Sequence, residues 1–450
     1  MAVLVATLAY GFNLRAEVLS LQVLHVFGSP GPAHPGGGVT RTADGSLYGT
    51  TPQGDGYGTA YRIAPNGEIS VQMVFSGANG YYPTAGLVAG LDGNFYGSPR
   101  VGGPNGAWTS FFRVTPTGDF TNITSLYGGT NSFTPEYAMI LAGDGNFYGT
   151  TTYGGAGYNE SGGSSGGGTV FKLTPTGNFT LLISFVGTNG FQPMGRLMQA
   201  SSGNVYGTTA FGGSFGLGTV FCIATNGDFQ TILSFDGTNG ASPVTGLVEA
   251  NDGWLYGMTE GDINSQGFGT IFKVSTNGDF GTIATFNGTN GRYPSGSLVK
   301  GDDGKLYGVT KLGGPHDGGT AFSVTTNGLI TVITSFNDAS GRWPTELTKG
   351  SDGNLYGTAS VLGGPFGNGT VFRLAQVPEI YSTSSSNGVV HLTWTAFTGG
   401  VYQVEYKSSL VETNWNPLSG RITAIGNSAS FDDSIGVITS RFYRVNLLPW

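Results

Sequence analysis

One eight-residue motif recurs seven times along the chain and restricts its fold more than any other feature. It is typified by SDGNLYGT at residues 351–358. Successive motif tyrosines lie 48, 52, 58, 50, 51 and 49 residues apart; they are Tyr48, Tyr96, Tyr148, Tyr206, Tyr256, Tyr307 and Tyr356. A fixed period near about 50 residues is typical of arrays in which each unit is one supersecondary element. The motif therefore predicts seven similar structural units.

Each unit contains four short strand-like runs separated by turn signals. In the sixth unit the runs are GSLVKG, KLYGVT, GTAFSVT and LITVITSF, between residues 296 and 336. Tight DDG and TNG turns join the first and last pairs, whereas a glycine-rich loop joins the middle pair. A proline then follows in every unit, and because proline cannot donate to a ladder, we expect a crossover between sheets there. One unit is thus predicted to be a four-stranded antiparallel meander, the blade of a β-propeller.

The phase of the repeat predicts how the array closes. The run LSLQVLHVF at residues 19–27 matches fourth strands, and the last unit ends at GTVFRL, residues 369–374, with no fourth strand after it. A solenoid would need capping units, and none is visible in the sequence. We therefore predict an all-β fold in which residues 19–374 form a seven-bladed β-propeller with four-stranded blades. Its N-terminal strand would close the last blade, and its motif tyrosines would be core residues wedged between blades.

Composition supports a folded, turn-rich chain and excludes two classes of protein. Glycine supplies 81 of 450 residues and charged residues only 10%, yet hydrophobic residues reach 38%, which is enough for a large core. The net charge of −8 without any Lys/Arg run argues against a nucleic-acid partner. The sequence has no stretch of about 18 apolar residues, so no membrane-spanning helix is predicted. The single cysteine, Cys222, forms no intrachain disulfide, and its largely polar counterparts in other units predict that it is half exposed.

The first eighteen residues are predicted to be a signal peptide or leader. They hold an apolar run from Ala2 to Phe12, with Ala16 as the cleavage residue, although a basic start is lacking. The alternative is a start that simply leads into the first strand. We accordingly expect a secreted or cell-surface protein, extracytoplasmic and monomeric.

The repeat unit resembles the GloVer-type tandem-repeat family of exported bacterial proteins. The resemblance is carried by DGNFYGTTTYGG followed by GGGTVFKLTPTGNFTLLISFVGTNGFQP, from Asp144 through Pro193, and extends over about residues 19–374. It implies a surface or secreted protein with a separate C-terminal sorting or anchoring module. It implies no enzymatic activity and no catalytic residues. The second unit, with SPRVGGPNGAWTSFF, and the fifth, with MTEGDINSQGFG, depart from the pattern.

The C-terminal segment predicts a second, smaller β domain. We expect residues 375–388 to be a linker and first strand region, and residues 389–450 to be a β-sandwich similar to fibronectin type III modules. Its runs alternate apolar and polar residues, and its predicted core comprises Trp394, Tyr402, Phe431 and Tyr443. A spacer or sorting role fits this segment better than ligand binding.

Candidate ligand-binding residues lie in the variable parts of the repeat. In propellers the crossovers and the middle-pair loops emerge on one face, around the central channel. There the sequence offers aromatic residues beside arginines and carboxylates, as recognition of a glycan or peptide requires. The candidates are Tyr82, Trp108, Tyr158, Arg292, Tyr293, His316, Arg342 and Trp343. Alternatively these aromatics only pack each crossover onto the blade, which the position of Tyr82, Tyr293 and Trp343 directly before a proline favours.

Three functions stay open on this reading of the sequence. The first is a binding or interaction scaffold whose partner is a polysaccharide or a surface protein. The second is a carbohydrate-active enzyme, a polysaccharide lyase or glycoside hydrolase, using Glu260 with Asp262 or the His316–Asp317 pair as acid and base. The third is a purely structural envelope protein. No cofactor is predicted, and no metal site, because the repeated Asp-Gly lacks the further acidic ligands of a calcium loop.

Overall fold

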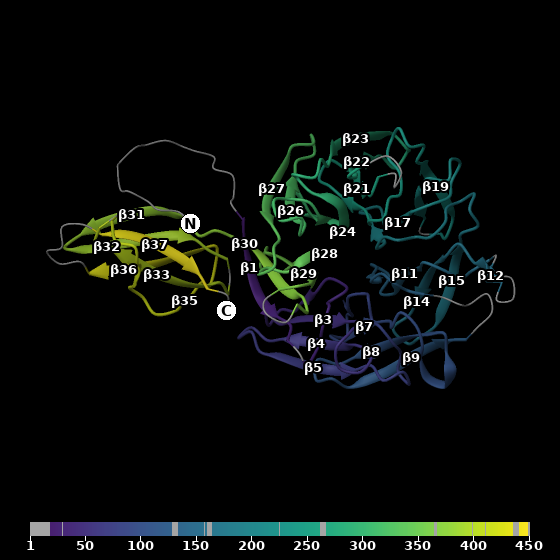
Figure 1. Ribbon diagram of the computed structural model, residues 1–450, viewed down its shortest axis with the longest axis horizontal. Coiled ribbons are helices and arrows are strands. Elements are labelled where there is room, and N and C mark those ends of the chain that lie inside the picture. The colour runs from purple at the N-terminus through teal and green to yellow at the C-terminus, as the bar shows by residue number, and fades with distance from the viewer. Residues whose placement is uncertain are drawn as a thin grey trace.

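A computed structural model describes residues 19–28, 30–127, 134–156, 158–159, 164–224, 226–261, 267–363, 367–397, 399–409, 411–434 and 441–448, with the side chains of 158–159 and 164–165 left aside. The predicted leader, residues 1–18, lies outside them. Residues 19–376 form seven sheets of four antiparallel strands each, arranged side by side (Figure 1). The predicted seven-bladed β-propeller is thereby confirmed.

The four strand positions of a blade recur in the same order. First strands begin beside the channel: β2 (Thr40–Arg41), β6 (Val88–Ala89), β10 (Ile140–Leu141), β16 (Met198–Gln199), β20 (Val248–Glu249), β24 (Arg292–Lys300) and β28 (Arg342–Lys349). Second strands carry the motif tyrosines: β3 (Leu47–Thr51), β7 (Phe95–Gly97), β11 (Phe147–Thr151), β17 (Val205–Thr209), β21 (Leu255–Thr259), β25 (Leu306–Leu312) and β29 (Leu355–Val361).

The outer half of each blade is a hairpin. Third strands are β4 (Thr59–Ile63), β8 (Thr109–Val114), β14 (Thr169–Leu173), β18 (Thr219–Ile223), β22 (Thr270–Val274), β26 (Thr320–Val324) and β30 (Thr370–Gln376). Outer strands are β5 (Ile69–Val74), β9 (Phe120–Leu126), β15 (Phe179–Ser184), β19 (Phe229–Ser234), β23 (Phe280–Thr285), β27 (Ile330–Ser335) and, from the start of the chain, β1 (Leu19–Val26). The third strands are buried almost throughout, because neighbouring blades cover both of their faces.

The ring closes as the repeat phase predicts. Strand β1 pairs with β30, from Leu19 opposite Gln376 to Val26 opposite Thr370, and completes the sheet β1-β30-β29-β28. An apolar cluster then joins this seventh blade to the first: Tyr356 and Val371 pack with Val39, Leu47 and their neighbours. A cluster of this kind lies at each of the seven blade boundaries.

The aspartate of the motif accepts two different hydrogen bonds, one that fixes the turn and one from the motif tyrosine. In the fifth blade Asp252 Oδ1 accepts the backbone N–H of Trp254 and so fixes the turn, while Oδ2 accepts the hydroxyl of Tyr256 at 2.7 Å. The same aspartate-to-tyrosine bond joins 92 to 96, 144 to 148, 303 to 307 and 352 to 356. The tyrosine rings meanwhile pack between blades. The Tyr48 ring, for example, stacks on that of Phe95 with the ring centres 4.0 Å apart. The tyrosines are therefore core residues, as predicted.

The glycine after each motif tyrosine makes room for an aromatic ring of the third strand. A Cβ added to Gly257 would lie 2.6 Å from Cζ of Phe272 and 2.7 Å from Cδ2 of Leu247. Both neighbours are buried, so neither has space to withdraw. The second strand thus uses glycine for close approach, as a strand glycine often does.

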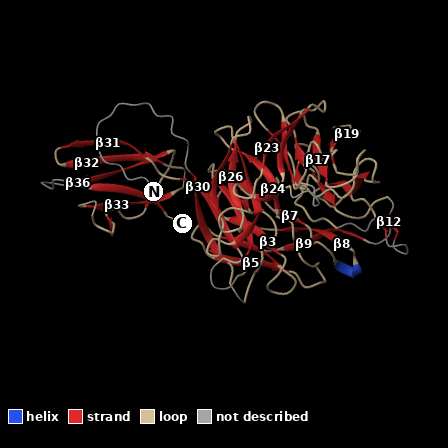
Figure 2. Cartoon of the chain, turned by 45° about the horizontal axis from the view of Figure 1, so that its top comes forward, coloured by secondary structure: helices blue, strands red, loops and turns tan. Residues whose placement is uncertain are grey.

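Two blades depart from the common pattern, the second where its sequence departs and the third in its longer glycine loop; in the fifth, residues 262–266 of the departing segment lie outside the described residues. In the second blade β7 has only three residues, and a short 3-10 helix, η1 (Pro104–Gly106), follows it (Figure 2). In the third blade a small hairpin, β12 (Tyr158–Asn159) with β13 (Ser164–Ser165), extends the glycine loop. Cys222 is buried instead of half exposed, because its side chain lies against the motif tyrosine Tyr206 at the blade boundary.

The C-terminal segment forms two sheets around its own core. One sheet holds β31 (Ile380–Ser386), β32 (Val389–Thr395) and β36 (Ser428–Ser434); the other holds β33 (Val401–Lys407), β34 (Asn416–Pro417), β35 (Ile422–Thr423) and β37 (Phe442–Leu447). Trp394 and Tyr402 are fully buried between them, and Phe431 and Tyr443 pack against the same cluster. We call this unit the C-terminal module; its likeness to fibronectin type III stays a prediction.

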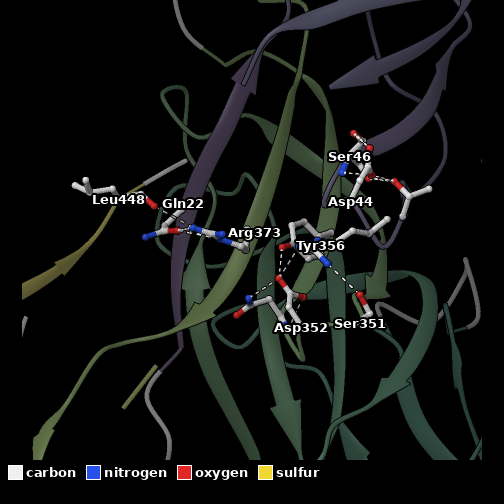
Figure 3. A network of polar contacts seen from close by, with 11 residues as sticks. Gln22, Asp44, Ser46, Ser351, Asp352, Tyr356, Arg373 and Leu448 are labelled. Atoms are coloured by element: carbon white, nitrogen blue, oxygen red, sulfur yellow. Dashed lines mark hydrogen bonds and ion pairs between the residues drawn. The ribbon is translucent and has the colours of Figure 1, made fainter. Parts of the chain in front are cut away.

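The C-terminal module touches the ring at the closing blade (Figure 3). Gln22 on β1 accepts a hydrogen bond from Arg373 on β30 and donates one to the carbonyl of Leu447. Arg373 also donates to the carbonyl of Leu448, and its guanidinium lies 5.3 Å from the centre of the Phe397 ring. In the first and third blades the equivalent cation binds the motif aspartate, as Lys172 binds Asp144. In the seventh blade Arg41 takes that place beside Asp352.

Candidate functional site

The crossovers and the glycine loops meet on one face of the ring, which we call the loop face. The residue before the crossover proline donates its backbone N–H to a glycine-loop carbonyl of the preceding blade, as Tyr82 does to Tyr57 and Trp343 to Gly318. Six of these residues have a positive φ between 53° and 59°: His34, Tyr82, Gln192, Ser242, Tyr293 and Trp343. A residue before proline ordinarily avoids this region, so tertiary contacts hold the crossovers in place.

Several large aromatic side chains stay exposed on the loop face. Tyr82 is 43% exposed, Trp108 44% and Trp343 45%. Phe211 and Phe215, in the glycine loop of the fourth blade, are also exposed. The centre of the Tyr82 ring lies 6.1 Å from that of Tyr57 and 6.2 Å from that of Tyr81, yet much of the Tyr82 surface stays exposed. The crossover backbone is therefore docked, while the side chains of Tyr82 and Trp343 keep much of their surface exposed.

Four of the predicted residues gather on the loop of the sixth blade. Arg292 binds Asp317 at 2.8 Å and lies 5.7 Å from the centre of the Tyr293 ring. The Arg292 hydrogen bond lowers the pKa of Asp317, burial opposes it, and the charge of Arg342 lowers it further. Arg342, the residue directly before Trp343, binds Asp338 at 2.6 Å.

Of the remaining predicted residues, His316 lies on the same loop, whereas Tyr82, Trp108 and Tyr158 belong to other blades. His316 is exposed beside Asp317, which pairs with Arg292, and within the described residues no hydrogen bond joins His316 to Asp317. Tyr82 belongs to the first crossover and Trp108 to the loop of the second blade. Tyr158 lies in β12, but its side chain is outside the description, as are Glu160 and Asp262.

A cavity of about 370 Å³ occupies the central channel below the loop face. Its wall is formed by the residues that follow the crossover prolines and by the ends of the second strands. None of the seven predicted ligand-binding residues with described side chains lines it, but Glu260 does. In a chain with only 10% charged residues, six charged side chains stand in this wall: Arg100, Glu136, Arg196, Glu260, Lys311 and Glu346.

The six charges alternate in sign around the ring. They belong in order to the second through seventh blades, each blade supplying one, while the first blade contributes Gly36 and Gly37. Arg100 Nε binds Glu136 Oε1 at 2.7 Å between neighbouring blades. Arg196 Nη1 reaches toward Glu346 Oε1 at 3.9 Å, from the fourth blade to the seventh. The wall as a whole is neutral, with donors and acceptors interleaved.

Three of these groups have unused hydrogen-bonding capacity. The Nε of Arg196 is buried without a hydrogen-bond partner. Within the described part of the chain, neither Glu260 nor Lys311 takes part in an ion pair. Tyr137 lies in the same wall, where burial and the charges of Glu136 and Glu260 raise the pKa of its phenol. The wall therefore presents both a strong donor and a strong acceptor to the cavity.

Sequence reasoning missed most of this charged ring. It named Glu260 for another pairing but did not single out Arg100, Arg196, Lys311 or Glu346. A signal was present: these charges occupy repeat positions one to three residues after the crossover proline or four after the motif tyrosine. Elsewhere those positions hold small or uncharged residues, such as Gly37, Val244 and Ala210.

Two other kinds of site find no support in the described residues. No group of three or more His, Cys, Asp or Glu side chains there is placed to share a metal ion. The one helical segment in those residues, η1, is far too short to cross a bilayer.

Comparisons with known proteins add the following similarities. The Gloeobacter/Verrucomicrobia repeat family matches residues 9–160, 157–302 and 253–428. No curated protein matches the sequence. Among solved structures the chain is similar to puromycin hydrolase at 11% identity and a TM-score of 0.51, over 82% of this chain and 59% of that one.

Two further solved structures are similar at lower TM-scores. PorZ, a surface component of the type-IX secretion system of Porphyromonas gingivalis, is 12% identical with a TM-score of 0.49, over 90% of this chain and 56% of that one. A gluconolactonase from Xanthomonas campestris is 12% identical with a TM-score of 0.45, over 80% and 90%. At such identities a structural likeness concerns the fold alone.

Proposed function

This chain belongs to the Gloeobacter/Verrucomicrobia repeat family, and we propose that it is an exported binding scaffold at the cell surface whose ligand is a glycan. The observation that carries the proposal is the exposure of aromatic side chains on the loop face, around an open channel. Exposed large apolar side chains gathered on one face mark interaction sites more often than they serve stability.

Aromatic rings suit a glycan because a sugar ring has an apolar face and a rim of hydroxyls. Tyr82 and Trp343 offer flat surfaces, and Arg292, Asp317 and Arg342 offer donors and acceptors around the sixth-blade loop on which Trp343 docks. Such a mixture of apolar surface and a few placed polar groups is typical of small-ligand sites. The purely structural alternative requires these aromatics to be packed away, and their exposure argues against it.

The remaining parts of the proposal concern location and organisation. Export is supported by the apolar run from Ala2 to Phe12. We take residues 19–374 as the binding unit, 375–388 as the connection and 389–450 as a spacer or sorting module. The protein would act as a monomer, because each blade boundary is already filled within one chain.

The test is a polysaccharide array probed with the full chain and read for both retention and released sugar ends. Retention without product is expected, and Trp343→Ala and Tyr82→Ala should each weaken it. Tyr381→Ala is the matched control, because Tyr381 is an exposed aromatic on the C-terminal module. Silence across the array, or equal retention by all variants, contradicts the proposal.

A carbohydrate-active enzyme, a lyase or hydrolase, is the second candidate. Glu260 favours it, since this carboxylate faces the channel cavity together with Glu136 and Glu346. Released reducing or unsaturated ends on the same array, lost in Glu260→Gln, would place this candidate first.

A further inference from the structure

We propose that the channel binds the carboxylate of an acidic sugar, so that the glycan recognised by the loop face is a uronic-acid polymer. Arg196 and Lys311 would bind the carboxylate, and Glu260 would accept hydrogen bonds from the sugar hydroxyls. This inference rests on the proposed glycan-binding function and names the class of glycan.

The first argument is the unpaired donor of Arg196. A buried N–H without a partner costs about 1 to 3 kcal/mol, so a folded chain seldom leaves one without a reason. Here Arg196 lines an open cavity, its Nε is buried without a partner, and the Glu346 carboxylate stands 3.9 Å from its Nη1. A guanidinium binds a carboxylate through two parallel hydrogen bonds, and Nε with an Nη atom forms one such pair. A ligand carboxylate would satisfy it.

The second argument is the pairing of the other charges. Arg100 is already bound to Glu136 and is not free for a ligand. Lys311 is exposed in the cavity wall and takes part in no ion pair within the described residues. Lys311 thus remains for a carboxylate, together with the Nε of Arg196, whose Nη1 is 3.9 Å from Glu346. Among the three carboxylates only Glu260 lacks an ion pair in those residues, and an ionised carboxylate accepts hydroxyl hydrogen bonds.

The third argument is size and access. A cavity of about 370 Å³ lies at the lower end of the range for small-ligand sites, about 300 to 1,000 Å³. It therefore fits one or two sugar units. Because Glu260 directly follows β21 and Lys311 lies near the end of β25, the cavity lies at the end of the channel nearest the loop face. A polymer could place one acidic unit in the channel and the next units on Tyr82 or Trp343.

The experiment compares uronic-acid oligosaccharides with their carboxyl-reduced counterparts, by calorimetric titration of the full chain. We expect the acidic sugars to bind at least about tenfold more tightly, which is about 1.4 kcal/mol. Arg196→Gln and Lys311→Gln should each remove most of that difference. Lys349→Gln, on the opposite face, is the control and should leave it unchanged, since Lys349 only binds exposed Asp302 there.

The outcomes separate this inference from the proposed function. Equal affinity for acidic and reduced sugars, with both weakened in Trp343→Ala, overturns the inference and leaves the glycan scaffold standing. No binding of either, together with a silent array, overturns both. Binding of a free amino acid in the channel in place of the sugar also overturns it. If Arg196→Gln fails to fold, as its thermal unfolding would show, Lys311→Gln still decides, because that side chain is exposed.

Discussion

The two faces of the ring follow opposite rules. On the face that holds the Asp-Gly turns, five blades make the same aspartate-to-tyrosine hydrogen bond, and only the residues around it change. On the loop face the backbone repeats but the side chains do not: the position before the crossover proline holds Tyr, Trp, Gln, Ser, Thr or His. Because repetition follows from identical joints, the repeated face carries stability, and the varied face is the one on which we propose recognition.

The largest effect that should separate the faces is a methyl group at a motif glycine. Gly257→Ala places a Cβ 2.6 Å from the buried Phe272 ring, and we expect a loss of about 3 kcal/mol in the free energy of unfolding. Chemical denaturation measures it. Gly281→Ala is the control in the same blade, because its Cβ would meet nothing closer than 3.7 Å. Equal losses at both positions would contradict the close-approach explanation.

A smaller loss, about 2 kcal/mol, is expected from Asp252→Ala. The change leaves the buried Tyr256 hydroxyl and the Trp254 N–H without their acceptor. Tyr256→Phe removes the hydroxyl itself, so no buried donor is left without an acceptor. The loss in the free energy of unfolding should therefore be smaller, about 1 kcal/mol. Asp302→Ala serves as the control on the same face, since its ion pair with Lys349 is exposed and worth little. The outcome to look for is the order of the three.

At alkaline pH the repeated face should weaken through the motif phenols. Burial raises the pKa of Tyr356 to about 12, and the charge of Asp352 adds to the rise. A raised pKa in the folded state contributes stability that is present below the ordinary phenol pKa of about 10 and is lost as pH rises toward about 12. We expect on the order of 1 kcal/mol, measured as unfolding free energy between pH 8 and 11. Tyr356→Phe should flatten this slope, whereas Tyr381→Phe, at an exposed site, should not.

The same face should also weaken in acid, by less. Burial raises the pKa of Asp44, but hydrogen bonds from Thr42 and Ser46 and the charge of Arg62 lower it to about 2. The stabilisation is therefore present above about pH 4 and is lost as pH falls toward about 2. Because Asp44 is exposed on the surface, the effect is small. Asp44→Asn should reduce the slope of unfolding free energy in that range, and an unchanged slope would argue against the contribution.

On the loop face, Trp343→Ala should change the unfolding free energy by less than about 0.5 kcal/mol. Its ring is 45% exposed, and the bond that docks the crossover comes from its backbone N–H. Thermal unfolding of this variant beside Gly257→Ala gives the sharpest contrast between the faces. A loss as large as that of the glycine variant would mean that the tryptophan is a structural residue after all.

The fold could be predicted from the sequence because each sequence repeat corresponds to one blade. The phase of the strand runs alone placed residues 19–27 in the last blade, and β1 pairs with β30 accordingly. The two-way use of the motif aspartate was not foreseen, although Asp precedes Tyr by four residues in all but the fourth unit. Turn geometry was a sufficient reason for Asp-Gly, so nothing in the sequence required the second bond.

The channel was harder to predict, because its residues meet only when the ring is closed. Arg196 and Glu346 are 150 residues apart in the sequence and face each other from the fourth and seventh blades. The positive φ before six of the seven crossover prolines also runs against the local preference of that position. Only the docking of each crossover on a glycine loop makes that conformation favourable, and this docking is a tertiary contact.

The pairing of β1 with β30 has a consequence in time. About 350 residues separate the partners Leu19 and Gln376, so the seventh sheet cannot be completed until the whole repeat array has been synthesised. Until then β1 has no partner strand. The first blade and the most recently synthesised blade each also lack the neighbouring blade that would cover one of their faces. Contacts this distant in sequence form slowly. The growing chain thus carries an open edge to which another strand can add, and the final blade ends that hazard.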